Sequence, residues 1–538
     1  MVALFTFGEL EIGVLTLIFL LPILAAFPTW LIGRVRIGFS KYFALIISGI
    51  ILLLTILAWM MFENHSLLPE TLHADRSTLA SGGWTLIENI VWVEAIGMSY
   101  SLGVDGLSLP LVLLGGFIFF VAVLASFKDI HEREPAYYAM IMLLETGVLG
   151  TFVATDFVIF YVAWELVLVP MFFLIGIWGG PKREYAAIYF FIYTHVASLV
   201  MLLGIIGIWL ESTKFTSITG VSSGTFSFEL ITQIATQQGF GTNLFVLLIF
   251  LALLFGFIVK VPSVPFHTWL PLAHVEAPTP GSMILAGLLL KMGGYGLLRM
   301  GGWFLPEALA EFAWLVAIIG LISLLYGSWV ALRQIDMKSL VAYSSVGHMG
   351  IVLLGVATQS SEGFAGAMYM QIAHGIISPL MFFVAGTIGH STNTRDIPKL
   401  KGFAKQMPIT AAVLVFGSFA SAGLPGLAGF WSELLAFVAL FTWPGQTIPV
   451  INIGIVGMSI AMIGVLGIIF TAAYYLWMLQ RTVFGDVNPE LEHAHDVSHL
   501  SQYMTLGLLC LFTLLLGIFP RFLIDLMSTA TTFFASMF

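Results

Sequence analysis

Charged residues are scarce in this chain. Lysine, arginine, aspartate and glutamate make up 9% of the 538 residues, whereas hydrophobic residues make up 59%. Soluble domains carry about a quarter charged residues, because their surfaces face water. The composition therefore excludes an ordinary soluble domain and predicts an integral membrane protein. The formal net charge is -9, so the chain lacks the basic excess that attracts nucleic acid.

Cysteine is almost absent as well. The single cysteine, Cys510, lies in an apolar run, which excludes a disulfide, a cysteine-ligated zinc site and an iron–sulfur cluster within this chain. An acidic segment holds three histidines, for which a solvated loop is favoured over a weak metal site; they are His493, His495 and His499. We predict no metal and no cofactor bound by this chain.

Two further signals are missing. No glycine-rich phosphate loop follows a strand-like segment, and "GLPGLAG" (Gly423 to Gly429) has the wrong spacing for one. The opening stretch "MVALFTFGELEIG" lacks the basic region of a cleavable signal. We therefore expect the first span to remain in the mature protein.

Long apolar runs are what the chain has in abundance. A membrane-spanning helix needs roughly 20 mostly apolar residues, so the sequence predicts an all-α polytopic membrane protein with about fourteen spans. They lie near 13–33, 42–62, 107–127, 136–154, 156–178, 187–210, 244–277, 281–300, 313–332, 339–357, 363–389, 410–440, 451–479 and 502–524. The seventh and twelfth are too long and contain helix breakers, so we expect each to be two half-helices.

The distribution of basic residues predicts the orientation. With the N-terminus outside, the inside loops hold 14 lysines and arginines and the outside segments hold four. The inside group is Arg34, Arg36, Lys41, Lys128, Arg133, Lys182, Arg183, Arg333, Lys338, Arg395, Lys399, Lys401, Lys405 and Arg481. The outside group is Arg76, Lys214, Arg299 and Arg521. This asymmetry follows the positive-inside rule and predicts that both termini lie outside.

Ionisable side chains interrupt several spans, where each charge costs at least about 2.5 kcal/mol on insertion scales. They are Glu145, Glu165, Lys260, Lys291 and Glu433, together with His195, His267, His274, His348 and His374. Any one of them could belong to a structural ion pair or a satisfied core. So many in neighbouring spans favour a path for protons or cations, because buried ion pairs rarely repay their desolvation.

The predicted helix breaks lie beside these charges. Pro262 and Pro265 follow Lys260, and Pro425 lies among glycines just before Glu433. Irregular backbone is tolerated at membrane depth only beside protein or a water-filled cavity. Both breaks therefore place a charged group where water can reach it.

The offsets suggest an internal repeat. Lys260 and Glu433 are 173 residues apart, and Glu165 and His348 are 183 apart. Both steps advance by five spans, and an odd number inverts the second copy relative to the first. We expect an N-terminal region over 1–135, two inverted five-helix units over 136–300 and 301–480, and a loop with the last helix over 481–538.

Several motifs resemble a known family. They are "DGLSLPL", "WELVLVPMFFLIGIWGG", "VKVPSVPFHTWLPLAHVEAPTPGSMILAGLLLKMGGYGLLR", "AYSSVGHMG", "QIAHG" and "LPGLAGFWSEL". Together they are similar to the chain M family of antiporter-like subunits in the proton-pumping NADH–quinone oxidoreductases (respiratory complex I), homologues of mitochondrial NADH dehydrogenase subunit 4. The similarity extends over nearly the whole chain.

The resemblance implies roles for the buried groups. It implies that Glu165 pairs with Lys260, that Lys291 continues a central polar axis, and that Glu433 releases the proton outward. In the same resemblance His348 and His374 follow Lys291 in the relay, and His267 is an accessory member beside the first break. Glu145 is an auxiliary charge or, equally, a structural one.

The resemblance also implies an assembly. It implies partner membrane subunits, above all the homologous chains L and N, with lipids around them. FMN or FAD, iron–sulfur clusters and quinone would be bound in other subunits, and the electron donor would be NADH, F420H2 or ferredoxin. The membrane would be the prokaryotic cytoplasmic membrane or, alternatively, the mitochondrial inner membrane. A multisubunit Na⁺/H⁺ antiporter subunit is the alternative function, although such subunits usually have lysine where Glu433 stands. A purely structural scaffold is disfavoured by the number of buried charges.

Overall fold

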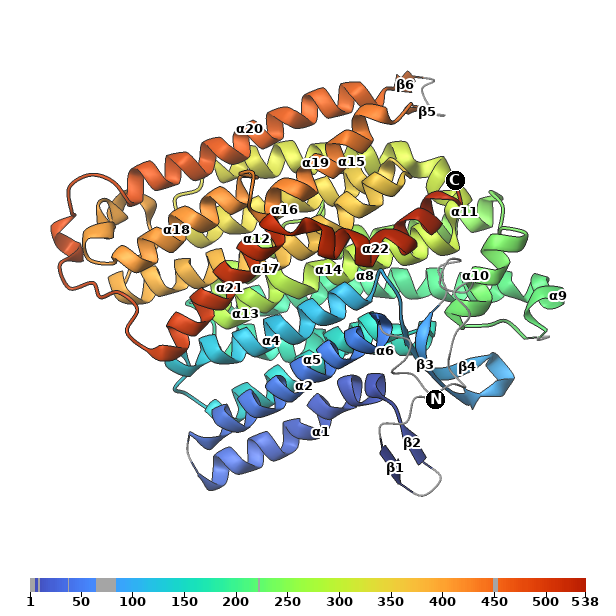
Figure 1. Cartoon of the computed structure of the whole chain (residues 1–538), viewed down its shortest axis with the longest axis horizontal. Helices are drawn as coiled ribbons and strands as arrows, with labels where there is room; N and C mark the ends of the chain where they lie inside the picture. The colour runs from blue at the N-terminus through green and yellow to red at the C-terminus, as the bar shows by residue number, and fades with distance from the viewer. Residues whose placement is uncertain (1–4, 8–9, 37, 64–83, 221–222, 449–452) are drawn as a thin grey trace.

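The computed structural model describes residues 5–7, 10–36, 38–63, 84–220, 223–448 and 453–538. The chain folds as a bundle of long helices, shown in Figure 1, and this confirms the predicted polytopic helical fold. Short β-hairpins are the difference from the expected all-α structure. They are β1–β2 (Phe5–Phe7 and Leu10–Ile12), β3–β4 (Thr85–Val93 and Met98–Val104) and β5–β6 (Gln446–Ile448 and Ile453–Ile455), all antiparallel.

Fourteen spans cross the bundle within the described residues. Twelve are apolar helical segments long enough to cross a membrane, and two more are each built from two shorter helices. The first seven are α1 (Val14–Val35), α2 (Phe39–Glu63), α4 (Leu109–Asp129), α5 (Glu134–Val153), α6 with α7 (Phe157–Leu166 and Leu168–Trp178), α8 (Arg183–Ser212) and α11 with α12 (Leu244–Lys260 and Trp269–Glu276). The other seven are α13 to η6 (Thr279–Phe304), α15 (Pro306–Ala331), α16 (Met337–Ala357), α17 (Ser361–Thr392), α18 with α19 (Pro408–Ser421 and Ala428–Thr442), α20 (Gly457–Thr482) and α21 (Leu500–Ile518).

Short helices fill the ends of the bundle. They are η3 (Glu94–Ile96), η4 (Thr213–Phe215), α9 (Thr216–Thr219), α10 (Phe228–Gln237), η7 (Ile397–Leu400), η8 (Phe403–Lys405) and η9 (Pro489–Leu491). A longer helix, α22 (Pro520–Ala535), follows α21 after a bend at Pro520 and packs against α17. The bend arises because a proline cannot continue the hydrogen-bond ladder of the preceding helix. The start of α1 and the end of α22 lie at the same end of the bundle (Figure 1), as an even number of spans requires.

Both predicted breaks are present. In the seventh span α11 ends at Lys260, and turns that contain Pro262 and Pro265 separate it from α12. In the twelfth span α18 ends at Ser421, and two glycines with left-handed backbone, Gly423 and Gly426, precede α19. Only glycine adopts that conformation without strain.

The eighth span has a geometry that the sequence did not predict. Two π-helical stretches, η5 (Leu285–Leu289) and η6 (Leu297–Phe304), flank the α-helical turns of α14 (Leu290–Gly296), which carry Lys291. The apolar window of this span is fully buried inside the protein. π-helical turns are rare in proteins. Where they occur, they are often found at functional sites.

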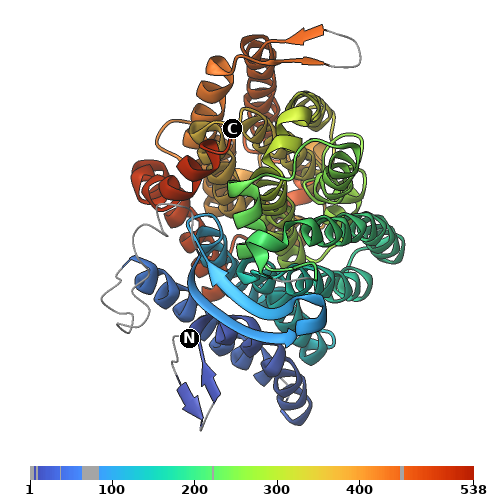
Figure 2. The same ribbon diagram turned by 90° about the vertical axis from the view of Figure 1, so that its right-hand side faces the viewer.

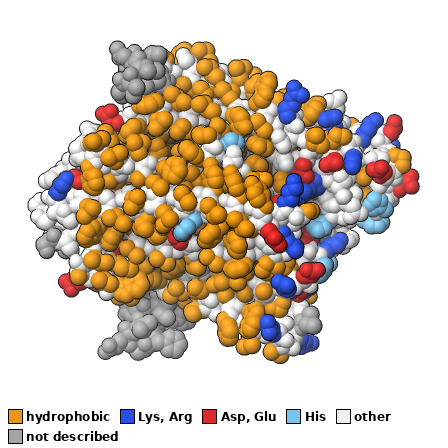
Figure 3. Space-filling model, turned by 180° about the vertical axis from the view of Figure 1, so that it is seen from behind, with side chains coloured by type: hydrophobic (Ala, Val, Ile, Leu, Met, Phe, Trp, Pro, Cys, Tyr) orange, Lys and Arg blue, Asp and Glu red, His pale blue; other side chains and the backbone are white. Residues whose placement is uncertain are grey.

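The surface and the interior use different helices. Apolar side chains cover the face in Figure 3, and lysines and arginines gather on the right of that view, the end opposite the hairpins. The spans α1, α2, α8 and α20 expose much of their apolar surface, whereas α16, α17 and the eighth span are almost wholly buried. Lys291, His348 and His374 therefore lie on the most enclosed helices, whereas Glu165 and His195 lie on α6 and α8 with side chains 22% and 39% exposed.

The β3–β4 hairpin lies across the end of the bundle opposite the lysine- and arginine-rich end (Figure 2). Its Glu88 accepts hydrogen bonds from the backbone N–H groups of Leu15 and Thr16 at 2.8 and 2.9 Å, which caps the start of α1. Asp156 accepts from the N–H groups of Ser99 at 3.0 Å and Val158 at 2.8 Å, which joins β4 to α6. The sequence placed Arg76 outside, between the second and third predicted spans, and that residue lies outside the described residues.

Candidate functional site

Most of the predicted site residues are buried. The relative exposures are Glu145 0%, Lys260 2%, His267 4%, Lys291 0%, His348 5%, His374 4% and Glu433 7%. Glu165 is more open, with a side chain 22% exposed. A charged group at these depths requires a partner or a path to water.

Lys291 and His374 are in direct contact across two helices. The Nζ atom of Lys291 lies 2.7 Å from Nδ1 of His374, and it also donates to the carbonyl oxygen of Ala286. Lysine in its charged form can only donate, so the imidazole Nδ1 accepts and the proton of the ring resides on Nε2. That Nε2 lies 3.0 Å from Oγ of Ser345. A chain of hydrogen bonds therefore connects the eighth span with α17 through His374 and with α16 through Ser345.

His348 continues this chain on α16. Its ring centroid lies 5.4 Å from that of His374, and its Nε2 lies 3.0 Å from the carbonyl oxygen of Ser421. A carbonyl only accepts, so Nε2 carries the proton. The Nδ1 atom has no partner among the described residues and is free to accept a proton. Ser421 ends α18 at the second helix break, so the break and the imidazole are directly linked.

A small cavity joins the imidazoles to Glu433. Its volume is about 10 Å³, and its lining includes His348, His374, Ser421 and Glu433. That is about the space one water molecule needs. Gly423 contributes to the fit, because a Cβ at that position would collide with the Glu433 carboxylate. The second break therefore leaves room for this carboxylate to face the cavity.

Ser421 also begins a second row of hydrogen bonds, formed by hydroxyl groups. The Ser421 hydroxyl lies 2.8 Å from the hydroxyl of Tyr475 on α20, and that phenol lies 3.1 Å from Oγ of Ser344. Neither Tyr475 nor Ser344 was assigned by the sequence. The two residues are 131 positions apart, and such a separation gives no local signal of their contact.

The first half of the axis differs from the expectation. Glu165 Oε2 lies 3.0 Å from Nδ1 of His195, not in an ion pair with Lys260. Lys260 instead sits 5.0 Å from the ring centroid of Trp164, and its Nζ has no hydrogen-bond partner in the described part of the chain. Consecutive helical residues point in different directions. Because Trp164 faces Lys260, its neighbour Glu165 is directed toward α8.

Two other predicted residues lie apart from this chain of contacts. His267 lies at the break of the seventh span, with its ring centroid 5.1 Å from Tyr326 and 6.1 Å from Tyr343. Glu145 is enclosed in α5, and neither carboxylate oxygen meets a hydrogen-bond partner among the residues the structure describes. Among the described residues, no hydrogen bond or ion pair joins either of them to Lys260 or Lys291.

Two basic residues predicted for loops are buried, which corrects those assignments. Arg299 was placed in an outer loop, but it lies in η6 and is fully buried. Both carboxylate oxygens of Asp105 lie 2.7 Å from its Nη2. Its guanidinium lies 4.1 Å from the ring centroid of Trp84 and 4.3 Å from that of Trp303. Lys338 was placed in an inner loop, but it lies in the first turn of α16 and is 4% exposed.

The histidine-rich segment near the C-terminus serves a local structural purpose. His499 caps α21, because its Nδ1 accepts from the N–H of Ser501 at 3.3 Å. The backbone N–H of His495 donates to Ser391 at 2.6 Å. The described residues contain no cluster of three or more metal-ligating side chains.

These features are those of a known class of membrane protein, and the chain belongs to it. The family described as "NADH:quinone oxidoreductase/Mrp antiporter, TM" matches residues 154–461, which carry both breaks and all of the axis from Lys260 to Glu433. Relatives extend the similarity beyond these residues to most of the chain. F(420)H(2) dehydrogenase subunit M of Methanosarcina mazei is 40% identical over 458 residues, 85% of this chain and 87% of that protein.

Two further comparisons agree. NADH-quinone oxidoreductase subunit M of Rickettsia conorii is 35% identical over 448 residues, 83% of this chain and 85% of that one. Among solved structures, a chain of respiratory complex I from Thermus thermophilus with bound NADH superposes with a TM-score of 0.80 at 26% identity, covering 97% of this chain and 99% of the other. This chain is thus a relative of the subunit M proteins of oxidoreductase complexes.

Proposed function

We propose that the chain is a proton-translocating membrane subunit of an NADH–quinone-type oxidoreductase complex, with its driving energy supplied by redox chemistry in other subunits. The observation that carries the proposal is the buried contact between Lys291 and His374, extended by His348 to the cavity at Glu433. An amine, two imidazoles and a carboxyl group all exchange protons readily. The subunit M relatives support the same assignment.

The transfer along this axis follows from the donor and acceptor roles. Lys291 gives a proton to Nδ1 of His374, and the proton on the opposite ring nitrogen leaves toward Ser345 and His348. His348 accepts a proton at its free Nδ1 and becomes doubly protonated. It then releases one ring proton to water in the cavity, and that water passes a proton on to Glu433. Moving a charge against the membrane potential requires about 2.3 kcal/mol per 100 mV, so each step must be coupled to an external energy source.

Glu165 acts as the adjustable charge in this scheme. With its carboxylate directed toward His195, its hold on Lys260 is weak; rotation toward Lys260 strengthens that hold. Such a change in one subunit alters the field felt by the next one. The two orientations of the Glu165 side chain, toward His195 or toward Lys260, therefore form a switch at the entrance of the axis.

The assembly proposed here follows the same family. Homologous chains L and N are the neighbours, lipids fill the apolar flanks, and flavin, iron–sulfur clusters and quinone are bound by other subunits. Residues 136–300 and 301–480 form two inverted units, between an N-terminal region (1–135) and a C-terminal segment (481–538). The end rich in lysine and arginine faces the cytoplasm, which puts both termini outside.

The test uses Lys291→Met in inverted membrane vesicles that hold the assembled complex. Donor-driven electron transfer and proton uptake, followed with a pH-sensitive dye, should both fall about tenfold or more. Normal redox-driven uptake would refute the proposal. Loss of Na⁺-driven proton exchange, with redox-driven uptake intact, would identify a Na⁺/H⁺ antiporter subunit instead.

A further inference from the structure

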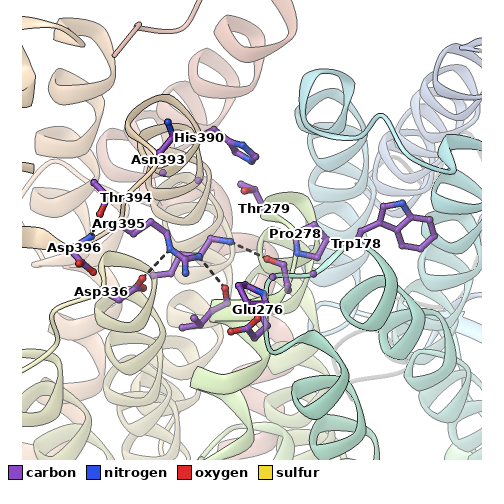
Figure 4. Close-up of a pocket in the computed structure, with 18 residues that line it drawn as sticks. Trp178, Glu276, Pro278, Thr279, Asp336, His390, Asn393, Thr394, Arg395 and Asp396 are labelled. Carbon is purple, nitrogen blue, oxygen red and sulfur yellow. Dashed lines mark hydrogen bonds and ion pairs between the residues drawn. The ribbon is translucent and has the colours of Figure 1, made fainter. Parts of the chain in front are cut away.

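Two cavities of opposite character lie in the bundle. One, of about 530 Å³ at the basic end, is lined by charged side chains such as Glu276, Asp336 and Arg395 (Figure 4). The other, of about 300 Å³, is lined by apolar side chains of α2, α4, α17, α21 and α22, and we call it the apolar groove. Water fills a cavity only where polar groups hold it. The apolar groove is therefore suited to an apolar ligand rather than to water.

The apolar groove has the length of a lipid chain in one leaflet. Both α2 and α21 pack on α4, and in Figure 1 they lie on opposite sides of it. Along α4 the lining runs from Pro110, near the hairpin end of the bundle, to Phe120, a rise of about 15 Å at roughly 1.5 Å per residue. The hydrocarbon core of a bilayer is about 30 Å thick, so a chain from one leaflet fills about 15 Å of it. The match in length indicates a lipid chain from the leaflet on the hairpin side.

The groove is open toward the surface of the bundle. Ile56 of α2 and Phe512 of α21 both line it, and they are 36% and 37% exposed. Its inner wall includes Ile372 and Ile376 of α17, which are buried. A ligand can therefore enter sideways from the membrane, between α2 and α21, and lie against the buried side chains of α17.

Trp59 contributes a polar atom to this lining. It lies about one turn before the end of α2, and its ring meets that of Phe522 edge-on, with centroids 5.3 Å apart. The indole Nε1 is buried and has no hydrogen-bond partner among the described residues. A buried indole N–H usually has a partner, and tryptophans gather where a membrane meets water. This N–H requires an acceptor oxygen at the hairpin end of the groove.

Charged side chains of both signs lie at the same end. Arg521 precedes Phe522, and its Nε donates to Oδ2 of Asp525 at 3.1 Å. The two side chains are 89% and 62% exposed, and this hydrogen bond uses one of the five donors of the guanidinium. Glu63 lies about one turn beyond Trp59 on α2 and is also exposed. The rim of the groove therefore offers an arginine to a phosphate and carboxylates to an ammonium.

We propose that the apolar groove binds one chain of a phospholipid whose headgroup carries a primary ammonium, as in phosphatidylethanolamine. The chain lies along α4, the phosphate binds Arg521, and the ammonium binds Asp525 or Glu63. Once the half-exposed Phe522 ring turns aside, the Trp59 N–H donates to an oxygen of the lipid's glycerol backbone. An exposed ion pair contributes little to stability by itself, which fits a role of the Arg521 pair in binding. The inference goes beyond the proposed function and uses no residue of the proton axis.

The experiment uses the assembled complex in vesicles that contain a trace of phospholipid with a photoreactive diazirine at the end of one chain. Three probes with identical chains carry an ethanolamine, a choline or a glycerol headgroup, and mass spectrometry locates the labelled residues after illumination. The variants are Leu113→Trp, which fills the groove from α4, and Arg521→Gln, which removes the phosphate partner. The matched controls are Leu203→Trp, on the exposed surface of α8 away from the groove, and Lys214→Gln, which breaks the pair of Lys214 with Glu211.

We expect the label near Phe120 and Leu508, at the inner end of the groove, at a level above that on the lipid-facing residues of α8 and α20. The ethanolamine probe should label these residues about threefold more than the choline probe, because only a primary ammonium donates hydrogen bonds to carboxylates. Arg521→Gln should lower the labelling by all three probes about threefold. Leu113→Trp should reduce it to the level of α8 and α20, and both control variants should behave as wild type.

Three outcomes would overturn the inference. Uniform labelling of the lipid-facing helices in the wild type would show only ordinary lipid around the protein. Absence of label from the groove would mean that a partner subunit covers it or that it stays empty. Equal labelling by the ethanolamine and choline probes would refute the headgroup assignment. All three are read from the wild-type complex, so the test holds even if a variant fails to assemble. None of them bears on the proton axis, which Lys291→Met tests separately.

Discussion

The buried pair between Arg299 and Asp105 offers the sharpest test of how the fold is held together. Asp105→Asn preserves the size of the side chain but leaves a fully buried guanidinium without its counter-charge. Breaking a buried pair by removing one partner costs about 3–5 kcal/mol, which is about a hundredfold or more in the ratio of folded to unfolded protein. The stacking of Trp84 and Trp303 on the guanidinium offsets part of this loss.

The assay is the amount of assembled subunit in the membrane, together with the midpoint of heat denaturation in detergent. The matched control is Asp525→Asn, which breaks an exposed arginine–aspartate pair, Arg521 to Asp525 at 3.1 Å, and should change little. Combining Asp105→Asn with Arg299→Met should recover stability, because the orphaned charge is gone. Equal, small effects of Asp105→Asn and Asp525→Asn would refute the reasoning.

Three further predictions concern packing, pH and the first half of the axis. Gly517→Ala brings a Cβ into the backbone at the break of the twelfth span, so it should destabilise by about 1–3 kcal/mol in detergent melts, whereas Gly507→Ala meets no atom and should be neutral. Burial raises the pKa of Asp156 from its ordinary 3.8 to about 6. The folded state therefore holds the extra proton, stability falls as pH rises from about 4 to 6, and Asp156→Asn should remove this fall in melts across that range. Glu165→Ala should lower both redox flux and proton uptake in vesicles, with His195→Gln less severe; unchanged activities in Glu165→Ala would make that glutamate structural.

Hydrophobic length and helix breakers allowed much of the fold to be predicted. Runs of apolar residues located the spans, since a bilayer fixes the length of a spanning helix. Prolines after Lys260 and glycines before Glu433 located the two breaks, because proline lacks a backbone N–H and glycine adopts left-handed backbone without strain. Both signals are local, and both are confirmed.

What depends on the packing of distant segments could not be predicted. The partner of Glu165 depends on how α6 is rotated, and Trp164 takes the place beside Lys260 that the carboxylate was expected to fill. The burial of Arg299 depends on its pairing with Asp105, which lies 194 residues earlier in the chain. The Lys291–His374 contact joins residues 83 apart. Spacing along a chain cannot reveal such pairs.

The most direct test of the proton axis is Glu433→Gln in the assembled complex, with donor oxidation and proton release measured together in membrane vesicles. Glu362→Gln is the matched control, because that glutamate is exposed at the start of α17. The axis predicts that Glu433→Gln lowers proton translocation about tenfold or more while Glu362→Gln retains it. Full translocation without the Glu433 carboxyl group would contradict the axis.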